Sequence, residues 1–89
     1  MDINLSSKFK RSYKKLPIYI QNDFNNKISI FIKNPRNPKL KTHKLKGKLQ
    51  NCLAFNLCDG YRVLFEFSFK DTVDILDVGP HGKYSQWKK

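Results

Sequence analysis

The chain has 89 residues, with 18 lysines and arginines against 7 aspartates and glutamates, so its formal net charge is +11 at pH 7. A chain of this length buries only about 60 to 65% of the surface that it exposes when unfolded, which leaves room for one core. We therefore expect a single domain over residues 1–89. No apolar run approaches the roughly 20 residues that a membrane span needs, which argues against a membrane protein.

The two cysteines, Cys52 and Cys58, are expected to be free thiols. They fall on one predicted strand, whose rise separates them by roughly 20 Å, too far for a disulfide within it. The two cysteines and two distant histidines also lack the spacing of a zinc site. Because the first residues do not have the pattern of a secretory signal, we expect a cytoplasmic protein. Because a zinc spacing is lacking, we also expect no metal, and we expect no other cofactor.

Two helices are predicted in the amino-terminal half, after a short edge strand at Ile3 to Leu5. Ser6 or Ser7 can cap the first helix, and Pro17 ends it and suits the start of the second. The second helix should stop before Asn34-Pro35, because the residue before a proline avoids helical angles. Apolar residues recur at helical spacing in both, namely Phe9, Tyr13 and Leu16, then Ile20, Phe24, Ile28, Phe31 and Ile32.

The period of the apolar residues changes to two over 49–57 and 61–67, which predicts a β-hairpin. A two-residue loop would put Leu57 on the same face as Arg62. A three-residue loop, Cys58-Asp59-Gly60, instead pairs Leu57 with Tyr61 and keeps the apolar residues together, with Gly60 where a positive φ is needed. This register places Asn56 opposite Arg62 on the other face.

A last strand is predicted over 72–78, although its residues do not alternate clearly and its facing stays open. A two-residue turn at Lys70-Asp71 would place Gly79 beside Arg62, with His81 just past the strand end. The predicted fold is α+β, with two amino-terminal helices packed on an antiparallel sheet of three or four strands in the order βααβββ.

A basic segment with no regular period spans 34–48 and is predicted to be a surface loop. Between Phe24 and Cys58 the chain has no acidic residue. Such a segment attracts polyanions, although charge does not distinguish RNA, DNA, an acidic protein or a membrane surface. The structural alternative is a solvated lysine-rich surface.

RNA cleavage without a metal needs a group that takes the proton of the ribose 2′-hydroxyl, cations at the phosphate, and an acid for the departing 5′-oxygen. Imidazole groups titrate near neutral pH and suit proton transfer. The candidates are His81 and His43 for proton transfer, Arg62, Lys44, Lys46 and Lys48 for the phosphate, and Tyr84 for stacking a base.

Structural readings of three of the neighbouring residues remain open. Arg62 could simply pair with Glu66 or Asp77. Asp77 could orient a histidine or accept a salt bridge. Trp87 is expected to close the core as a hydrophobic lid.

Several segments, taken in order, resemble one known family. They are Leu45-Lys46-Gly47 after His43, Gly60-Tyr61-Arg62-Val63-Leu64-Phe65, and Ile75-Leu76-Asp77-Val78-Gly79-Pro80-His81 with a tyrosine nearby. The chain in this respect is similar to the RelE/ParE superfamily of toxins from type II toxin–antitoxin systems. It is most similar to the YafQ and RelE/StbE branches, whose members cut mRNA in the ribosomal A site.

The resemblance implies an mRNA endonuclease with His81, His43, Arg62 and Lys46 in catalysis or phosphate binding. It implies two partners, mRNA on the ribosome at the 30S A site and a cognate antitoxin. Asn56 stands where the YafQ-like pattern has a histidine, and we count it with the substrate-binding candidates. Two alternatives remain: a ParE-like poison of DNA gyrase without catalysis, with the tail from Gly82 to Lys89 carrying the binding, and a non-catalytic RNA-binding module.

Overall fold

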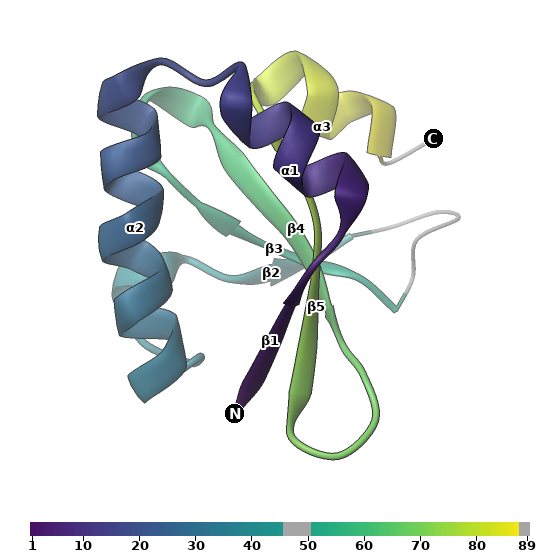
Figure 1. Ribbon diagram of the computed structural model, residues 1–89. Coiled ribbons are helices and arrows are strands. Elements are labelled where there is room, and N and C mark those ends of the chain that lie inside the picture. The colour runs from purple at the N-terminus through teal and green to yellow at the C-terminus, as the bar shows by residue number, and fades with distance from the viewer. Residues whose placement is uncertain (46–50, 88–89) are drawn as a thin grey trace.

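The computed structural model describes residues 1–45 and 51–87, for residues 84 and 85 the backbone alone. Its strands form one sheet in the order β1-β5-β4-β3-β2, in which only β1 and β5 run parallel. The elements are β1 (Asp2–Leu5), α1 (Ser7–Lys14), α2 (Ile18–Lys33), the 3-10 turn η1 (Pro38–Leu40), β2 (His43–Lys44), β3 (Leu53–Asn56), the 3-10 turn η3 (Cys58–Gly60), β4 (Arg62–Phe67), β5 (Thr72–Gly79) and α3 (His81–Trp87). Figure 1 shows α2 along the sheet and α1 beside α3 at the end where β5 finishes.

The predicted α+β fold with two amino-terminal helices on a sheet is confirmed, but the prediction of three or four antiparallel strands is wrong. The sheet has five strands and is mixed. The difference lies at the two edges, where β1 pairs in parallel with β5 and β2 forms inside the predicted basic loop. A strand of two residues has no period to detect, and the parallel pairing joins opposite ends of the chain, so local patterns reveal neither.

The two amino-terminal helices form where predicted, except that α1 ends at Lys14, before Leu16, and Pro17 is the N-cap of α2. Ser6 caps α1, with its Oγ accepting the Phe9 N–H at 3.0 Å. The second helix ends at Lys33, directly before Asn34-Pro35. No helix among the described residues is long and apolar enough to cross a membrane. The main core lies between these helices and one face of the sheet, and its buried residues are Phe9, Leu16, Ile20, Phe24, Phe31, Leu40, Phe55, Leu57, Val63, Phe65, Val73, Ile75 and Val78.

The predicted hairpin register is confirmed. Phe55 lies opposite Val63, and Asn56 lies opposite Arg62. Gly60 has the expected positive φ, 77°, and Asp59 before it has a φ of 54°. The three-residue loop therefore keeps the apolar side chains of both strands on the face that packs against the helices.

Gly79 lies opposite Arg62 as predicted, although the chain reaches this register by another route. The turn is longer than expected, since the Ser68 N–H donates to Thr72 O at 2.8 Å. A bulge then shifts the register by one residue at Leu76, which falls between the residues paired with Leu64 and Phe65. The bulge explains why the last strand shows no regular alternation in the sequence.

A second, smaller core lies on the opposite face of the sheet, under α3. Trp87 is only 6% exposed and covers this face, which confirms its predicted role as a lid. The helix itself was not predicted. The buried residues of this core are Leu45, Cys52, Ala54, Leu64 and Trp87.

Candidate active site

Arg62 and His81 meet at the end of the sheet. Arg62 is the first residue of β4, and its Nη1 donates to the Gly60 carbonyl in the hairpin turn at 2.9 Å. The same nitrogen lies 3.4 Å from Nδ1 of His81, the first residue of α3. His81 is exposed and Arg62 half-buried. Because Gly79 lies opposite Arg62, the guanidinium of Arg62 and the imidazole of His81 come together at the strand end, as predicted.

The chemistry of the two groups decides the direction of this hydrogen bond. A guanidinium has donors only, so Nδ1 of His81 must accept. A neutral ring that accepts at Nδ1 carries its proton on Nε2. A permanent cation and an imidazole, which is able to transfer protons near neutral pH, therefore lie within one hydrogen bond of each other.

Asn56 lies beside this pair, opposite Arg62 on the neighbouring strand. Its Oδ1 atom is buried and has no hydrogen-bond partner within residues 1–45 and 51–87. A buried acceptor of this kind usually finds a donor in a protein, a water or a ligand. Asn56 therefore offers a buried hydrogen-bond acceptor next to Arg62 on the same face of the sheet.

His43 shares this face of the sheet but lies further out. It is opposite Ala54, which is opposite Leu64 on β4, so His43 is two strands away from β4, about 10 Å. Its Nδ1 lies 3.0 Å from the Lys41 carbonyl, which can only accept. Nδ1 of His43 therefore carries a proton, the opposite arrangement from His81.

The remaining predicted residues are not brought to the pair. Lys44 lies opposite Leu53 and follows His43 on β2, so its side chain starts from the other face of the sheet than Arg62. Lys46 and Lys48 lie outside the described residues, as does the side chain of Tyr84. The structure therefore joins Arg62, His81 and Asn56, with His43 on the same face.

Asp77 is close to this pair in sequence, and the sequence left its environment open. Its side chain is completely buried and accepts hydrogen bonds from Ser12 Oγ at 2.7 Å, from the Val78 N–H at 2.9 Å and from Trp87 Nε1 at 3.1 Å. Lys83 Nζ forms a salt bridge with it at 3.1 Å. Burial by itself raises the pKa of Asp77, but the hydrogen bonds from Ser12, Val78 and Lys83 outweigh burial and lower it.

Gly79 makes this salt bridge possible. A Cβ atom on Gly79 would lie 2.5 Å from Lys83 Cδ, so the lysine stem passes directly over the glycine. Beyond it, Lys83 Nζ also donates to Ser12 Oγ at 2.7 Å. These contacts tie α3 to β5 and α1, and therefore hold His81 in place at the start of the helix. The sequence motif Asp77-Val78-Gly79 contains the carboxylate and the glycine of this arrangement. The bulge at Leu76 breaks the alternation, so the sequence pattern does not reveal on which face of the sheet Asp77 lies.

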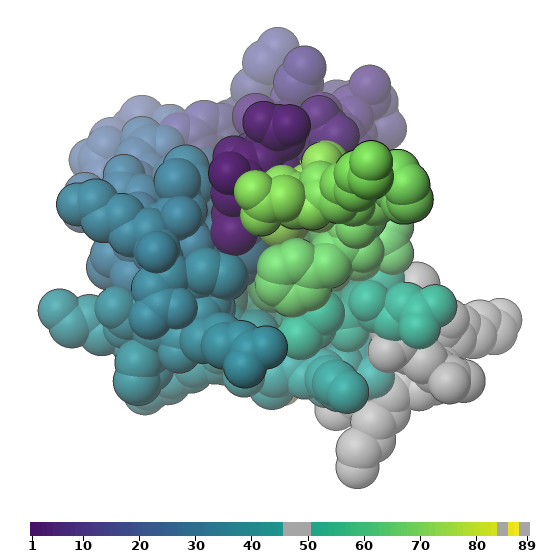
Figure 2. Space-filling view, turned by 90° about the horizontal axis from the view of Figure 1, so that it is seen from below, coloured from purple at the N-terminus to yellow at the C-terminus, as the bar shows by residue number. Residues whose placement is uncertain are grey.

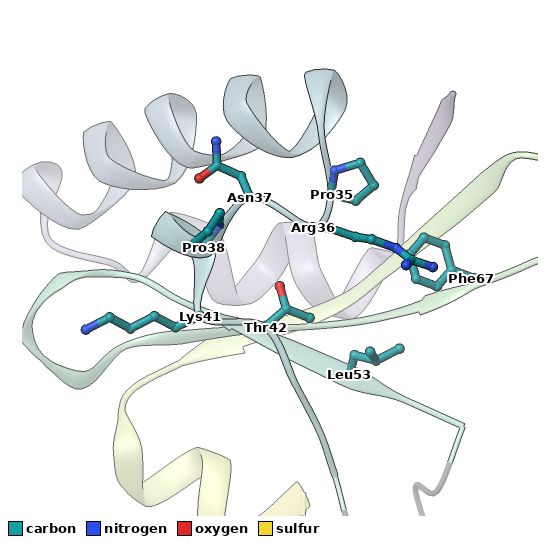
Figure 3. A pocket seen from close by; sticks show the side chains of 8 residues that line it. All are labelled: Pro35, Arg36, Asn37, Pro38, Lys41, Thr42, Leu53 and Phe67. Atoms are coloured by element: carbon teal, nitrogen blue, oxygen red, sulfur yellow. The ribbon is translucent and has the colours of Figure 1, made fainter.

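Two cavities lie near the ends of the sheet. One of about 250 Å³ includes the residues next to Arg62 and His81 in sequence, and it is lined by Ser12, Lys15, Leu16, Tyr61, Val78, Gly79, Pro80 and Lys83. Another, of about 430 Å³, lies between η1 and the β3–β4 pair (Figure 3), and it is lined by Pro35, Arg36, Asn37, Pro38, Lys41, Thr42, Leu53 and Phe67. Neither Arg62 nor His81 lines either of these two cavities.

The cysteines and acids offer no metal centre in the part of the chain that the structure describes. No group of three or more His, Cys, Asp or Glu side chains is placed there to hold a metal ion. Cys52 and Cys58 are both free thiols, as expected. Burial, with the nearby Glu66, raises the pKa of Cys52, so it is not an activated nucleophile.

Sequence comparison finds no matching family model and no matching curated protein. The structure is similar to YafQ from E. coli strain BL21(DE3), with a TM-score of 0.78 and 16% identity over 93% of this chain and 96% of that one. The chain has the RelE/ParE fold. RelE in the archaeal RelE–RelB complex from Pyrococcus horikoshii OT3 has a TM-score of 0.72 and 22% identity, over 92% of this chain and 96% of that one. A YoeB/ParE toxin from Agrobacterium tumefaciens has a TM-score of 0.77 and 14% identity, over 91% of this chain and 99% of that one.

Proposed function

We propose that the protein is the toxin of a type II toxin–antitoxin system and that it cleaves mRNA on the ribosome, at the 30S A site, in the cytoplasm. The observation that carries the proposal is the contact of 3.4 Å between Arg62 Nη1 and His81 Nδ1 at an exposed end of the sheet. A net charge of +11 attracts RNA to this site. The shared fold with YafQ and RelE supports the same function.

The proposed reaction uses the ribose 2′-oxygen as the nucleophile. It attacks the adjacent phosphorus, the bond from phosphorus to the 5′-oxygen breaks, and the products carry a 2′,3′-cyclic phosphate and a 5′-hydroxyl. Arg62 binds the non-bridging oxygens, whose negative charge grows in the transition state. His81 transfers a proton, from the 2′-hydroxyl or to the departing 5′-oxygen, and His43 on the same face is its proposed complement.

The other proposed contacts position the substrate. Asn56 Oδ1 accepts a hydrogen bond from the nucleotide at Arg62, consistent with its buried acceptor that lacks a partner among the described residues. Lys44, Lys46 and Lys48 supply further cations for the RNA backbone, and Tyr84 stacks on a base. A cognate antitoxin is the second partner. Related folds have been crystallised with such partners, as in the E. coli DinJ–YafQ and RelB–RelE complexes.

The test is a map of 5′-hydroxyl mRNA ends after brief expression in cells. We expect new ends with the natural protein and a loss of at least about 100-fold with His81→Ala, the usual effect of removing a general acid or base. Because His81 is exposed, the variant should keep its fold. Asn26→Ala, an exposed position on α2, is the matched control and should cleave normally.

Other outcomes select other functions. Equal cleavage by His81→Ala would remove the proposed role of the imidazole. A DNA-damage response with no mRNA cleavage would favour a ParE-like gyrase poison. Salt-dependent RNA binding without any product, with ribosomes present, would leave a non-catalytic RNA-binding module.

A further inference from the structure

The cavity of about 430 Å³ between η1 and the β3–β4 pair is separate from the candidate active site. Phe67, which lines it, is the last residue of β4, whereas Arg62 is the first, so about 16 Å of strand separates the two. Figure 2 shows the blue residues after α2 and the green β4–β5 turn on one face of the molecule. The volume lies within the range of about 300 to 1,000 Å³ that is usual for small-molecule sites.

Two cations line this cavity. Arg36 and Lys41 are both exposed, and none of the residues that line the cavity is acidic. The loop that carries these cations is held by its own hydrogen bonds. The Arg36 N–H donates to Asn34 Oδ1 at 3.0 Å, and the Lys41 N–H donates to Pro38 O at 3.1 Å. The cavity therefore offers an anion two cations on a backbone that is already ordered.

A hydroxyl group in this cavity lacks a partner among the described residues. Thr42 Oγ1 is buried and has no hydrogen-bond partner within residues 1–45 and 51–87. Thr42 lines the cavity, and Figure 3 shows its oxygen directed toward the loop that carries Arg36. Because a buried hydroxyl usually finds a partner and is able both to donate and to accept, a polar group of a ligand would satisfy it.

One wall of the cavity is aromatic. The Phe67 side chain is 54% exposed, although it is apolar. In Figure 3 Phe67 and Arg36 lie on one side of the cavity, and Lys41 lies on the other. An exposed ring close to cations is typical of surfaces on which single-stranded nucleic acids stack their bases.

A nucleotide matches this combination of groups better than a peptide does. It carries a flat base, a phosphate, and ribose and base groups that donate and accept hydrogen bonds, all within one residue. An unmodified amino-acid residue does not supply a flat ring and an anion together, so an acidic peptide would need two residues to match the same walls. The net charge of +11 also attracts phosphates over a long range.

We propose that this cavity binds one nucleotide. The base stacks on Phe67, Arg36 and Lys41 bind the phosphate, and Thr42 Oγ1 forms a hydrogen bond with the ribose or the base. Two sources share this chemistry, a free mononucleotide and an unpaired residue of single-stranded RNA, and the experiment distinguishes them. The site goes beyond the proposed nuclease function, because it involves neither Arg62 nor His81.

The probes are 5′-AMP and a 2′-O-methyl adenylate tetramer, each added to the full-length protein. The tetramer has no 2′-hydroxyl, so the proposed nuclease reaction cannot cleave it. We expect saturable shifts of the ¹H–¹⁵N signals of Thr42 and Phe67. Tighter binding of the tetramer than of 5′-AMP would identify RNA as the source, and equal or weaker binding would identify a free nucleotide. Absence of saturable shifts at these two amides with both probes would overturn the proposal.

The contribution of the base is tested in two ways. Glycerol 3-phosphate has a phosphate but no ring, so it should bind at least about fivefold more weakly than 5′-AMP, the lower end of what one stacked base contributes. Phe67→Ala should weaken 5′-AMP binding by the same factor. Phe69→Ala is the control, because Phe69 is 78% exposed and does not line the cavity. Equal losses in the two variants would contradict stacking on Phe67.

The contribution of the phosphate is tested with charge variants. Arg36→Gln should weaken binding of 5′-AMP at least about threefold and leave binding of adenosine, which has no phosphate, unchanged. Lys39→Gln is the matched control, because Lys39 is exposed on the same loop but does not line the cavity. Equal losses in these two variants would indicate unspecific attraction and overturn the site. Displacement of 5′-AMP by a decapeptide of alternating leucine and glutamate would indicate a protein partner instead.

Discussion

Arg62 Nη1 lies 3.4 Å from His81 Nδ1, and the direction of this contact determines which nitrogen of the ring carries the proton. The guanidinium can only donate, so neutral His81 has its proton on Nε2. In His43 the partner of Nδ1 is the Lys41 carbonyl, 3.0 Å away, which can only accept. In their neutral forms the two histidines are therefore opposite tautomers, with the proton on Nε2 in His81 and on Nδ1 in His43.

This difference can be measured. We expect long-range ¹H–¹⁵N spectra at alkaline pH to show the Nε2–H tautomer for His81 and the Nδ1–H tautomer for His43. Arg62→Ala should release His81 to a mixture of tautomers and leave His43 unchanged. Identical tautomers for both rings in the natural protein would contradict the described contacts.

Gly79→Ala should destabilise the protein. The new Cβ would lie 2.5 Å from Lys83 Cδ and 3.0 Å from Lys83 Cβ, so the lysine would have to leave its path to Asp77. We expect the free energy of unfolding to fall by about 1 to 3 kcal/mol in urea denaturation, the usual range for an overpacked site. Gly82→Ala is the control, because a Cβ there meets nothing within 4 Å. It should be neutral or stabilising, since alanine favours the helix. Equal losses in both variants would refute the steric argument.

Asp77 should make stability depend on acid pH. Its pKa is lowered in the folded protein, because hydrogen bonds from Ser12, Val78 and Lys83 outweigh the effect of burial. The folded state thus binds fewer protons than the unfolded state just below the ordinary aspartate value of about 3.9. The stabilisation is complete above that pH and is lost as pH falls through the folded pKa.

Asp77→Asn tests this dependence. The variant should be less stable by about 3 kcal/mol at pH 7, because it leaves Lys83 without its carboxylate. The difference from the natural protein in free energy of unfolding should shrink below about pH 4. Asp2→Asn, at an exposed position, should show little of either effect. A difference that stays constant from pH 7 to pH 3 would rule out the charge of Asp77 as its source.

Tyr19 should titrate above the ordinary range of a tyrosine. Its hydroxyl donates to Asp59 Oδ2 at 2.7 Å, and this hydrogen bond is the main cause that raises the pKa of Tyr19 to about 12. The contact therefore favours the folded state below about pH 10 and is lost as pH rises towards 12. In absorbance titrations of phenolate, Asp59→Asn should return this step to the ordinary range near 10. A titration curve unchanged by Asp59→Asn would contradict the assignment.

Much of the local structure was predictable because its causes are local. Phe9, Tyr13 and Leu16 repeat with the period of a helix, and Pro17 and Pro35 limit the helices through backbone geometry. The hairpin register followed from one requirement, that all apolar residues share a face. That register was enough to place Asn56 opposite Arg62, as the structure confirms.

The site was predictable only as far as this register extends. The proximity of His81 to Arg62 followed from Gly79 lying opposite Arg62, although the predicted turn was too short and the bulge at Leu76 compensated for it. The contacts of Asp77 could not be predicted, because their donors come from α1, β5 and α3. No local pattern records which distant groups meet around a buried carboxylate.

The amino-acid sequence by itself determined the two helices, the hairpin with its turn at Gly60, and the strong positive charge, since each depends on residues close together in the chain. Only the tertiary structure decided that β1 runs parallel to β5, that α3 covers the second face through Trp87, and that Lys83 passes over Gly79 to Asp77. Those arrangements depend on contacts between segments far apart in sequence. Such contacts stabilise the protein only once the whole sheet has formed.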